Sequence, residues 1–410
     1  MYKRTKEVSS LLNKYIKNTP LEFNQFLSEK YKSNIYLKRE DLQFSRSFKI
    51  RGSLNKILKN KNNTQLVTAS AGNHAQGVAY SCNLLNKQGT IFLPNTTTLQ
   101  KINRIKYYGK DNIDIKIEGD YFTKTLNNAI NYCKQNNYIF IHPYDDMDII
   151  EGQSTIAHEI INEIYPDYIL TSVGGGGLIS GIVKYMDSYN NNNNNLCEII
   201  GVEPFGASSL TESLLKKDRI LLDNIDSFVD GASVSQIGVN NYEILKNTIK
   251  NTIIVSNPHI SHELINMYQN EGIVLEPAGV MPICALETIK NDIKGKNVVC
   301  ILSGGNNDLT RYNELMELNL FYLDLKHYFI LDFIQKPNQL KIFMNKILKE
   351  GDDITRFEYI KKSNKNYGKV LIGIELDKKE NITNIISNLQ KYNYKFKKIE
   401  LNDYIYDLII

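Results

Sequence analysis

The chain has 410 residues, 42% of them hydrophobic, and a formal net charge of +4. This length predicts two or three domains, and the small charge, spread along the chain, gives no reason to expect a nucleic-acid or acidic-membrane partner. The five cysteines are far apart, the N-terminus lacks the apolar segment of a signal peptide, and no apolar run approaches the roughly 18 residues that span a bilayer. We therefore expect a cytoplasmic protein with reduced thiols.

Residues 1–33 are predicted to be helical, with a break at Pro20. From residue 34 to residue 302, strands and helices are expected to alternate. The expected strands are 34–37, 65–68, 90–94, 113–117, 138–141, 168–173, 198–202 and 297–302. This alternation predicts parallel sheets with helices on both faces. A run of asparagines at 190–195 is expected to be a surface loop.

The pattern changes after about Leu320. The expected order is a strand at 328–334, a helix at 338–348, strands at 354–360 and 369–376, a helix at 382–392 and a strand at 396–399. This β-α-β-β-α-β order is ferredoxin-like. The segment has no glycine-rich turn and no cluster of catalytic residue types, so we expect a separate C-terminal domain.

Lys49 lies in the segment Ser-Phe-Lys-Ile-Arg-Gly, between an expected strand and an expected helix. A lysine at such a junction can be packed against the protein, and burial favours the free amine that forms Schiff bases. A solvated surface lysine is the commoner case, because buried lysine is rare. The other motifs of the chain decide between the two readings.

Four glycines at 174–177, followed by Leu178, join a buried strand to a helix. Glycines let successive N–H groups point at one anion, and a helix N-terminus adds a positive field. We predict a phosphate site, with a flexible linker as the alternative. The turn lacks the Gly-Lys-Ser/Thr ending of nucleotide-binding loops, which argues against a nucleoside triphosphate.

A phosphate site, a Schiff-base lysine and the lack of a metal motif suggest pyridoxal 5′-phosphate. The turn at 70–74 offers N–H groups to a substrate carboxylate and the Asn73 amide to the ring hydroxyl; an ordinary helix-capping turn is the alternative. Residues 303–306 follow the last strand, at the end where α/β sheets bind ligands. A simple strand-ending turn is the alternative there.

Six motifs occur in one order: Ser-Phe-Lys-Ile-Arg-Gly, Ser-Ala-Gly-Asn-His-Ala-Gln-Gly, Gly-Gly-Gly-Gly-Leu, Gly-Val-Glu-Pro, Glu-Pro-Ala-Gly and Ser-Gly-Gly-Asn. Over about residues 5–320 the chain thereby resembles the serine/threonine dehydratases, α/β enzymes of pyridoxal-phosphate fold type II. The remainder resembles the ACT-like regulatory domain of short biosynthetic threonine dehydratases. The resemblance implies a catalytic region at 1–320, with a smaller subdomain at about 53–148 inserted in it, and a regulatory domain at 326–410.

The resemblance also implies a role for each motif residue. Lys49 carries the cofactor, Phe48 covers its ring, Asn73 holds the ring hydroxyl, Ser303 faces the pyridine nitrogen, and Gly174, Gly175, Gly176, Gly177 and Leu178 bind the phosphate. The substrate carboxylate is assigned to Ser70, Gly72, Asn73 and His74, and a monovalent cation to Glu203, Ala207 and Ser209.

These residues favour β-elimination. The Lys49 amine can take the Cα proton as a general base. A hydroxyl at Ser303 cannot keep the ring nitrogen protonated as a carboxylate would, so the carbanion is less delocalised and elimination is favoured over transamination. With L-threonine the products are 2-oxobutanoate and ammonia, the threonine ammonia-lyase reaction on the route to isoleucine. The resemblance further implies L-serine as a second substrate, isoleucine and valine as effectors, and a homotetramer.

Other functions stay open at this point. A serine dehydratase, a β-replacement enzyme or a racemase would use the same scaffold. Ala71 argues against the racemase, because serine racemases of this family carry there a second serine that acts as the base on the opposite ring face. A non-enzymatic amino-acid sensor, with the C-terminal domain as its working part, is a further alternative.

Overall fold

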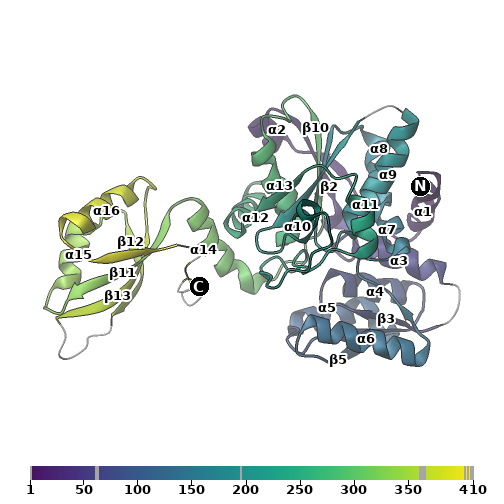
Figure 1. Ribbon diagram of the computed structural model, residues 1–410, viewed down its shortest axis with the longest axis horizontal. Coiled ribbons are helices and arrows are strands. Elements are labelled where there is room, and N and C mark those ends of the chain that lie inside the picture. The colour runs from purple at the N-terminus through teal and green to yellow at the C-terminus, as the bar shows by residue number, and fades with distance from the viewer. Residues whose placement is uncertain are drawn as a thin grey trace. The chain divides into compact units, whose positions relative to one another are not determined.

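The fold is described from a computed structural model, which divides into two compact units, Met1–Asp308 and Leu309–Ile410. The structure describes residues 2–60, 64–193, 196–359, 366–400, 403 and 406. Each unit is described by itself (Figure 1).

The larger sheet of the first unit has six strands in the order β1-β2-β10-β7-β8-β9. These are β1 (Leu21–Phe23), β2 (Asn34–Arg39), β10 (Asn297–Leu302), β7 (Tyr168–Ser172), β8 (Glu198–Pro204) and β9 (Thr252–Val255). All neighbours are parallel except β1, which pairs antiparallel with β2. The parallel strands thus present their carboxyl ends at one edge, where an α/β sheet binds its ligand.

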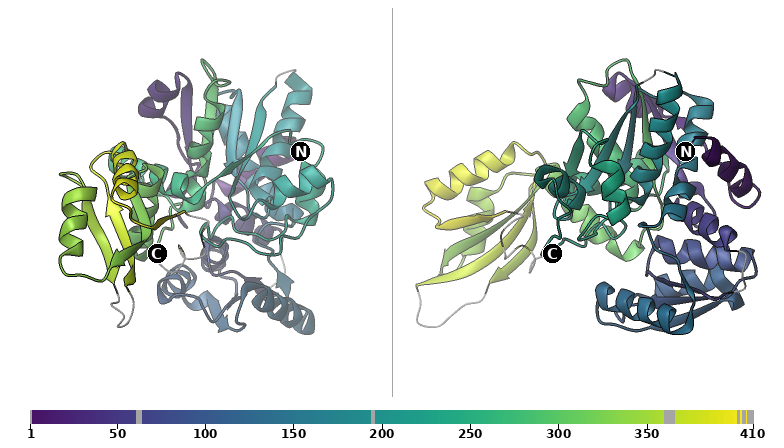
Figure 2. Two further views of the ribbon diagram at one scale, coloured as in Figure 1. Left: turned by 60° about the vertical axis from the view of Figure 1, so that its left-hand side comes forward. Right: turned by 45° about the vertical axis from the view of Figure 1, so that its right-hand side comes forward.

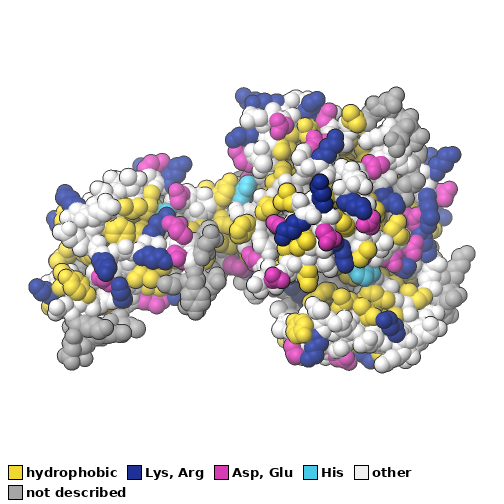
Figure 3. Space-filling model, viewed as in Figure 1, with side chains coloured by type: hydrophobic (Ala, Val, Ile, Leu, Met, Phe, Trp, Pro, Cys, Tyr) yellow, Lys and Arg dark blue, Asp and Glu magenta, His cyan; other side chains and the backbone are white. Residues whose placement is uncertain are grey.

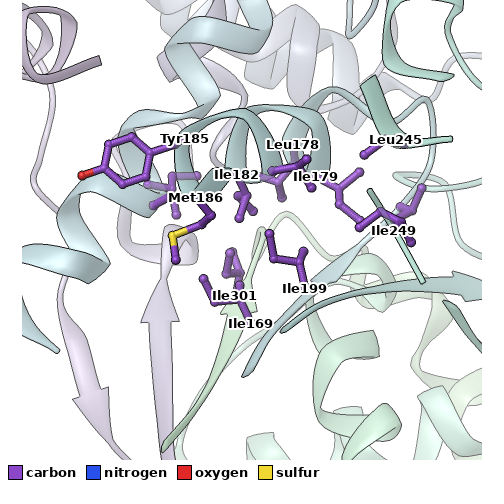
Figure 4. Close-up of a cluster of buried hydrophobic side chains, with 14 of the residues drawn as sticks. Ile169, Leu178, Ile179, Ile182, Tyr185, Met186, Ile199, Leu245, Ile249 and Ile301 are labelled. Atoms are coloured by element: carbon purple, nitrogen blue, oxygen red, sulfur yellow. The ribbon is translucent and has the colours of Figure 1, made fainter. Parts of the chain in front are cut away.

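Helices cover both faces of this sheet. Figure 1 shows α8 (Thr155–Glu163) and α9 (Gly177–Asn193) on one side, with α12 (Asn257–Glu271) and α13 (Pro277–Ile289) on the other. In Figure 4, Ile169, Ile199 and Ile301 of the sheet point toward Ile182 and Met186 of α9. Burial of such side chains is the main favourable term that holds helix to sheet.

The smaller sheet has four parallel strands in the order β5-β4-β3-β6. They are β3 (Leu66–Ala69), β4 (Gly89–Leu93), β5 (Ile113–Ile117) and β6 (Ile139–Phe140). One face packs against α4 (Asn73–Leu84) and α5 (Leu99–Gly109), and the other against α6 (Phe122–Asn136). In sequence this sheet lies between α3 (Lys49–Lys59) and α7 (Met147–Gln153).

Two expectations for the first unit were wrong in part. Residues 1–33 form α1 (Tyr2–Leu12) and α2 (Gln25–Tyr31), but β1 lies between them because it finds a pairing edge on β2. The asparagine run was expected to be a loop, yet α9 extends to Asn193, since adding residues to an existing helix is far easier than starting one. Asn194 and Asn195 lie outside the described residues. Two further helices of this unit are α10 (Ser209–Lys216) and α11 (Val239–Leu245).

The second unit begins with a short 3-10 turn at Leu309–Arg311, which α14 (Tyr312–Tyr322) follows. There follow β11 (Lys326–Ile334), α15 (Gln339–Ile347), β12 (Asp353–Tyr359), β13 (Tyr367–Glu375), α16 (Asn381–Lys391) and β14 (Phe396–Ile399). The sheet is antiparallel with the order β12-β13-β11-β14. Both α15 and α16 pack on one face of it (Figure 2). The ferredoxin-like expectation is confirmed, although Ile360 of the expected third element lies outside the described residues.

No helix within the described ranges is long and apolar enough to cross a membrane. On the face shown in Figure 3, Lys and Arg side chains are interspersed with Asp and Glu. Such mixing creates no large field of one sign on that face.

Candidate active site

Lys49 is the first residue of α3, so its side chain starts at the junction between loop and helix. Its Nζ donates to the carbonyl of Pro143 at 3.0 Å and lies 5.3 Å from the ring centroid of half-buried Phe48. Desolvation by the surrounding protein lowers the pKa of Lys49 to about 8, against the opposing pull of the Glu276 carboxylate. The site therefore holds a lysine that gives up its proton far more easily than a surface lysine does.

The four-glycine turn joins β7 to α9, which begins at Gly177. A Cβ added at Gly175 would lie 2.3 Å from the Tyr144 ring, and one at Gly177 would lie 2.9 Å from the Tyr144 carbonyl oxygen. Gly176 has a φ of +92°, a conformation that glycine adopts without strain. The turn is thus tightly packed rather than a loose linker. The first N–H groups of α9, including that of buried Leu178, have no acceptor within the helix and can bind an anion.

A hydrogen-bond brace holds this turn. The Nδ2 of fully buried Asn241 donates to the carbonyls of Gly175 at 2.8 Å and Tyr144 at 3.2 Å, and the Gly238 N–H donates to the same Gly175 carbonyl at 3.2 Å. The Asp145 carboxylate accepts from the first N–H groups of α11, at 2.9 Å each. The loop after β6 and the start of α11 therefore fix the turn from outside.

The turn after β3 places Asn73 at the first position of α4, with Gly72 before it. The Asn73 amide donates from Nδ2 to Glu276 Oε1 at 2.6 Å and accepts at Oδ1 from Asn306 Nδ2 at 2.7 Å. The Ser70 hydroxyl accepts from the Gly72 N–H at 3.3 Å. Both segments expected at the site, the turn at 70–74 and the loop after β10, are thus joined through Asn73.

The His74 imidazole is hydrogen-bonded to the protein and does not point to a substrate role. Its Nε2 lies 3.0 Å from the carbonyl oxygen of Ile141, and the ring is buried. Burial, with the charge of Lys49 nearby, lowers the pKa of His74 to about 3, so the imidazole is neutral at physiological pH. Of His74, only the backbone N–H at the start of α4 remains to serve a substrate carboxylate.

Ser303 follows β10 directly and is 3% exposed. Its carbonyl accepts from the Phe48 N–H at 3.1 Å, and the next residue, Gly304, forms an antiparallel bridge with Ser47. The strand end and the lysine segment are therefore held side by side. Within the described part of the chain no group hydrogen-bonds the Ser303 hydroxyl, which leaves it available to a ring nitrogen.

Glu203 on β8 is fully buried, and burial raises its pKa to about 7 although three hydrogen bonds oppose the rise. Its oxygens accept from the N–H groups of Leu210 at 2.8 Å and Thr211 at 2.7 Å, and from the Thr211 hydroxyl at 2.6 Å. Ala207 and Ser209 lie beside it in sequence and are buried, and the Ser209 hydroxyl has no partner among the described residues. The Glu203 carboxylate accepts hydrogen bonds from the first turn of α10. Cation binding by Glu203, Ala207 and Ser209 stays a prediction.

Sequence reasoning assigned no role to several residues that build the site. Glu276 and Asn306 lie in the quoted motifs Glu-Pro-Ala-Gly and Ser-Gly-Gly-Asn, yet only the structure shows that they grip Asn73. Arg51, in the lysine motif, lies in the first turn of α3 and is fully buried. It pairs with Glu40 at 2.8 Å and Glu159 at 2.6 Å. The sequence signal that could have pointed to these three residues was their place within the quoted motifs.

Pyridoxal 5′-phosphate fits these residues. A lysine amine of lowered pKa suits its aldehyde, and a glycine turn at a helix N-terminus suits its phosphate. The Ser303 hydroxyl, which the protein leaves without a partner in the described ranges, suits the ring nitrogen. The Asn73 amide uses one N–H on Glu276, so its second N–H can serve the ring hydroxyl.

Comparison with known proteins gives the same cofactor. The family described as Pyridoxal-phosphate dependent enzyme matches residues 12–304, and the C-terminal regulatory domain of Threonine dehydratase matches residues 317–409. The biosynthetic L-threonine dehydratase IlvA of Halalkalibacterium halodurans is 45% identical in an alignment of 404 residues that covers 97% of this chain and 96% of that protein.

Two solved structures share the fold. The processed form of threonine deaminase isoform 2 from Solanum lycopersicum has a TM-score of 0.72 at 32% identity, over 78% of this chain and 93% of that one. The serine racemase from Dictyostelium discoideum has a TM-score of 0.68 at 29% identity, over 75% of this chain and 99% of that one. These matches confirm the expected fold type II architecture with a C-terminal α+β regulatory domain. The chain therefore belongs to the pyridoxal-phosphate-dependent enzymes and, within them, to the biosynthetic threonine dehydratases that carry a single C-terminal regulatory domain.

Proposed function

We propose that the chain dehydrates and deaminates L-threonine to 2-oxobutanoate and ammonia, the threonine ammonia-lyase reaction, as the first step toward isoleucine. One observation carries this proposal. A lysine amine of lowered pKa shares the site with a hydroxyl, not a carboxylate, at the end of β10. Bound pyridoxal phosphate supplies the electron sink for the pair of electrons left at Cα.

The chain's own residues supply positioning and proton transfer. The N–H groups at the start of α4, beside Gly72 and Asn73, hold the substrate carboxylate. The Lys49 amine takes the Cα proton as general base. The Cβ–O bond then breaks and the hydroxyl leaves as water, taking up one proton that balances the one Lys49 removes from Cα. The released enamine becomes an imine, which water hydrolyses to the 2-oxo acid and ammonia. Each residue acts from the end of a strand or the start of a helix, which limits its movement.

We further propose that residues 1–320 form the catalytic region, with a subdomain at about 53–148 inserted in it, and that residues 326–410 regulate it. Isoleucine is the expected inhibitor and valine its antagonist. Such coupling needs two states of the protein that differ in effector affinity. L-Serine is the expected second substrate, a homotetramer the expected assembly and the cytoplasm the expected location.

Steady-state formation of 2-oxobutanoate from L-threonine, with and without isoleucine and with no thiol added, tests reaction and regulation together. We expect turnover without the thiol, and a saturation curve that isoleucine moves to higher threonine concentration. If no 2-oxo acid forms, and a parallel assay with thiol added consumes the thiol, the enzyme is a β-replacement enzyme. If isoleucine leaves the curve unchanged, the second unit has another role.

A further inference from the structure

Three hydrogen bonds close a ring around the Asn73 amide. Asn73 Nδ2 donates to Glu276 Oε1 at 2.6 Å, and Asn306 Nδ2 donates to Asn73 Oδ1 at 2.7 Å. The backbone N–H of Asn306 donates in turn to the Glu276 carboxylate. The three residues come from the start of α4, the residue before α13 and the loop after β10. We call them the Asn73 ring.

The ring allows one orientation of the Asn73 amide. Burial raises the pKa of Glu276 to about 7, and its ionised carboxylate can only accept, while the NH₂ group of Asn306 can only donate. If the Asn73 amide were turned over, its oxygen would face the carboxylate and its NH₂ group would face another NH₂ group. Both hydrogen bonds would then be lost in a site where unpaired polar groups are unfavourable. The second N–H of Asn73 Nδ2 therefore keeps a fixed direction.

The ring is itself anchored. The other N–H of Asn306 Nδ2 is held by the Ser45 carbonyl at 2.9 Å, four residues before Lys49. The Glu276 N–H donates to the Gly304 carbonyl at 3.2 Å, and a Cβ on Gly304 would lie 2.5 Å from Glu276 Oε1. Glu276 is 8% exposed. The ring is thus tied both to the lysine segment and to the end of β10.

We propose that Glu276 and Asn306 are positioning residues, which hold the Asn73 amide so that its second N–H points at the ring hydroxyl of pyridoxal phosphate. The inference rests on the proposed function and assigns these two residues a task in it. A donor fixed at that oxygen stabilises its anionic form and favours bound cofactor over free cofactor. Neither residue needs to touch the cofactor, because both act through Asn73.

A cofactor analogue separates this role from a structural one. The dissociation constant is measured for pyridoxal 5′-phosphate and for 3-deoxypyridoxal 5′-phosphate, which lacks the ring hydroxyl. We expect Glu276→Met to weaken binding of the normal cofactor about tenfold relative to the analogue, the effect of losing one oriented hydrogen bond; any change that acts through Lys49 is common to both cofactors and cancels in this ratio. The visible absorption band of the normal complex should shift, while Glu276→Gln, whose oxygen still accepts from Asn73, should retain the original band.

Two further variants complete the test. Asn306→Ala removes the donor to Asn73 Oδ1 but keeps the backbone N–H that donates to Glu276. It should therefore weaken binding of the normal cofactor in the same selective way. If Glu276→Met does not fold, the Asn306→Ala result tests the proposal alone. In an Asn73→Ala background, Glu276→Met should not weaken the normal cofactor further relative to the analogue, because residues acting as one unit are not additive. Glu287→Met, at an exposed position of α13, the helix that follows Glu276, is the matched control.

Equal weakening of both cofactors by Glu276→Met and Asn306→Ala would overturn the proposal, because it would show general damage to the site. Unchanged binding of both would overturn it as well. The binding measurements need no turnover, so they are independent of the threonine assay. An enzyme that forms no 2-oxobutanoate but keeps the selective loss would refute the proposed function alone.

Discussion

Arg51 and Glu159 form a two-pronged ion pair in the interior, with Nη1–Oε1 at 2.6 Å and Nη2–Oε2 at 2.8 Å and no exposure of the Arg51 side chain. Glu40 accepts from the same guanidinium at 2.8 Å, and the Lys38 ammonium lies 2.6 Å from Glu159. Two cations and two carboxylates are thus buried together and balance. Because Arg51 lies two residues after Lys49, this cluster fixes the start of α3.

Removing one charge from this buried cluster should destabilise the fold. Burial opposes ionisation of Glu159, but the Arg51 and Lys38 charges outweigh it and lower the pKa of Glu159. Its contribution is therefore present above the usual pKa of a glutamate and is lost as the pH falls through the lowered value. We expect Glu159→Gln to reduce the free energy of unfolding by about 3–5 kcal/mol at neutral pH, as measured by denaturant unfolding.

A second substitution tests the charge argument for Glu159→Gln. Adding Lys38→Met should restore part of the lost stability, since Arg51 and Glu40 again balance. Asp120→Asn, which breaks the exposed pair with Lys124, is the control and should have little effect. A loss no larger than that of the control would contradict the interpretation.

The lowered pKa of Lys49 predicts how cofactor capture depends on pH. With a pKa of about 8, about a tenth of the amine is neutral at pH 7, against roughly one part in 3,000 for an ordinary lysine. The rate at which cofactor-free protein captures pyridoxal phosphate should rise with pH and level off above about 8. Stopped-flow absorbance measures it, with Lys134→Ala as the exposed control. A rate that still rises tenfold between pH 9 and 10 would refute the prediction.

Gly175 should reject even a methyl group. The Cβ of alanine there would lie 2.3 Å from the Tyr144 ring, and overpacking of this kind costs about 1–3 kcal/mol. We expect Gly175→Ala to weaken cofactor binding by about tenfold or more, since each 1.4 kcal/mol is one factor of ten. Equilibrium dialysis of Gly175→Ala combined with Tyr144→Ala, compared with Tyr144→Ala alone, is the test. If removing the ring restores nothing, the loss is not steric.

Cation dependence tests the group of Glu203, Ala207 and Ser209. A carboxylate with carbonyls and a hydroxyl suits a hard cation, and the buried Ser209 hydroxyl lacks a partner among the described residues. We expect higher threonine turnover in potassium chloride than in tetramethylammonium chloride of equal ionic strength. Glu203→Gln should abolish the difference, while Glu198→Gln at the start of the same strand should retain it. Equal activity in both salts would contradict the predicted cation site.

The resemblance to serine racemases predicts that Ala71 limits the chemistry to one face of the substrate. It has no side-chain proton to give, so racemisation of L-serine should be weak. Ala71→Ser places a hydroxyl there and should raise the formation of D-serine about a hundredfold, the smaller end of what one acid–base group contributes. Chiral chromatography measures it, with Ala71→Gly as the control. An unchanged rate in the serine variant would count against the assignment of this position.

Local patterns predicted most of the fold. Apolar runs such as β10 and the helices between them indicated parallel sheets, and the strand–helix order of residues 326–399 indicated the ferredoxin-like unit. These features depend on periodicity within one segment. Strand β1 was missed because three residues carry almost no period, and their strand state depends on an edge supplied by β2.

The site was less accessible to the sequence. Lys49, the glycine turn and Ser303 belong to motifs that can be read locally. The Asn73 ring cannot be read locally. One of its hydrogen bonds joins residues that are 203 positions apart in the sequence, and another joins residues that are 233 positions apart. The commitment of the His74 imidazole to Ile141 is equally non-local, since the two are 67 positions apart.

The pairing of β2 with β10 also constrains how the chain is made. Asn34 is in register with Asn297, and Arg39 with Leu302. At a synthesis rate of about 5–20 residues per second, β2 leaves the ribosome tens of seconds before its central partner exists. During that time only β1 can cover one of its edges. The smaller sheet, made from residues 66–140, is complete long before. We therefore expect a nascent chain stalled before residue 297 to hold a folded smaller sheet and an unpaired β2 edge that chaperones recognise.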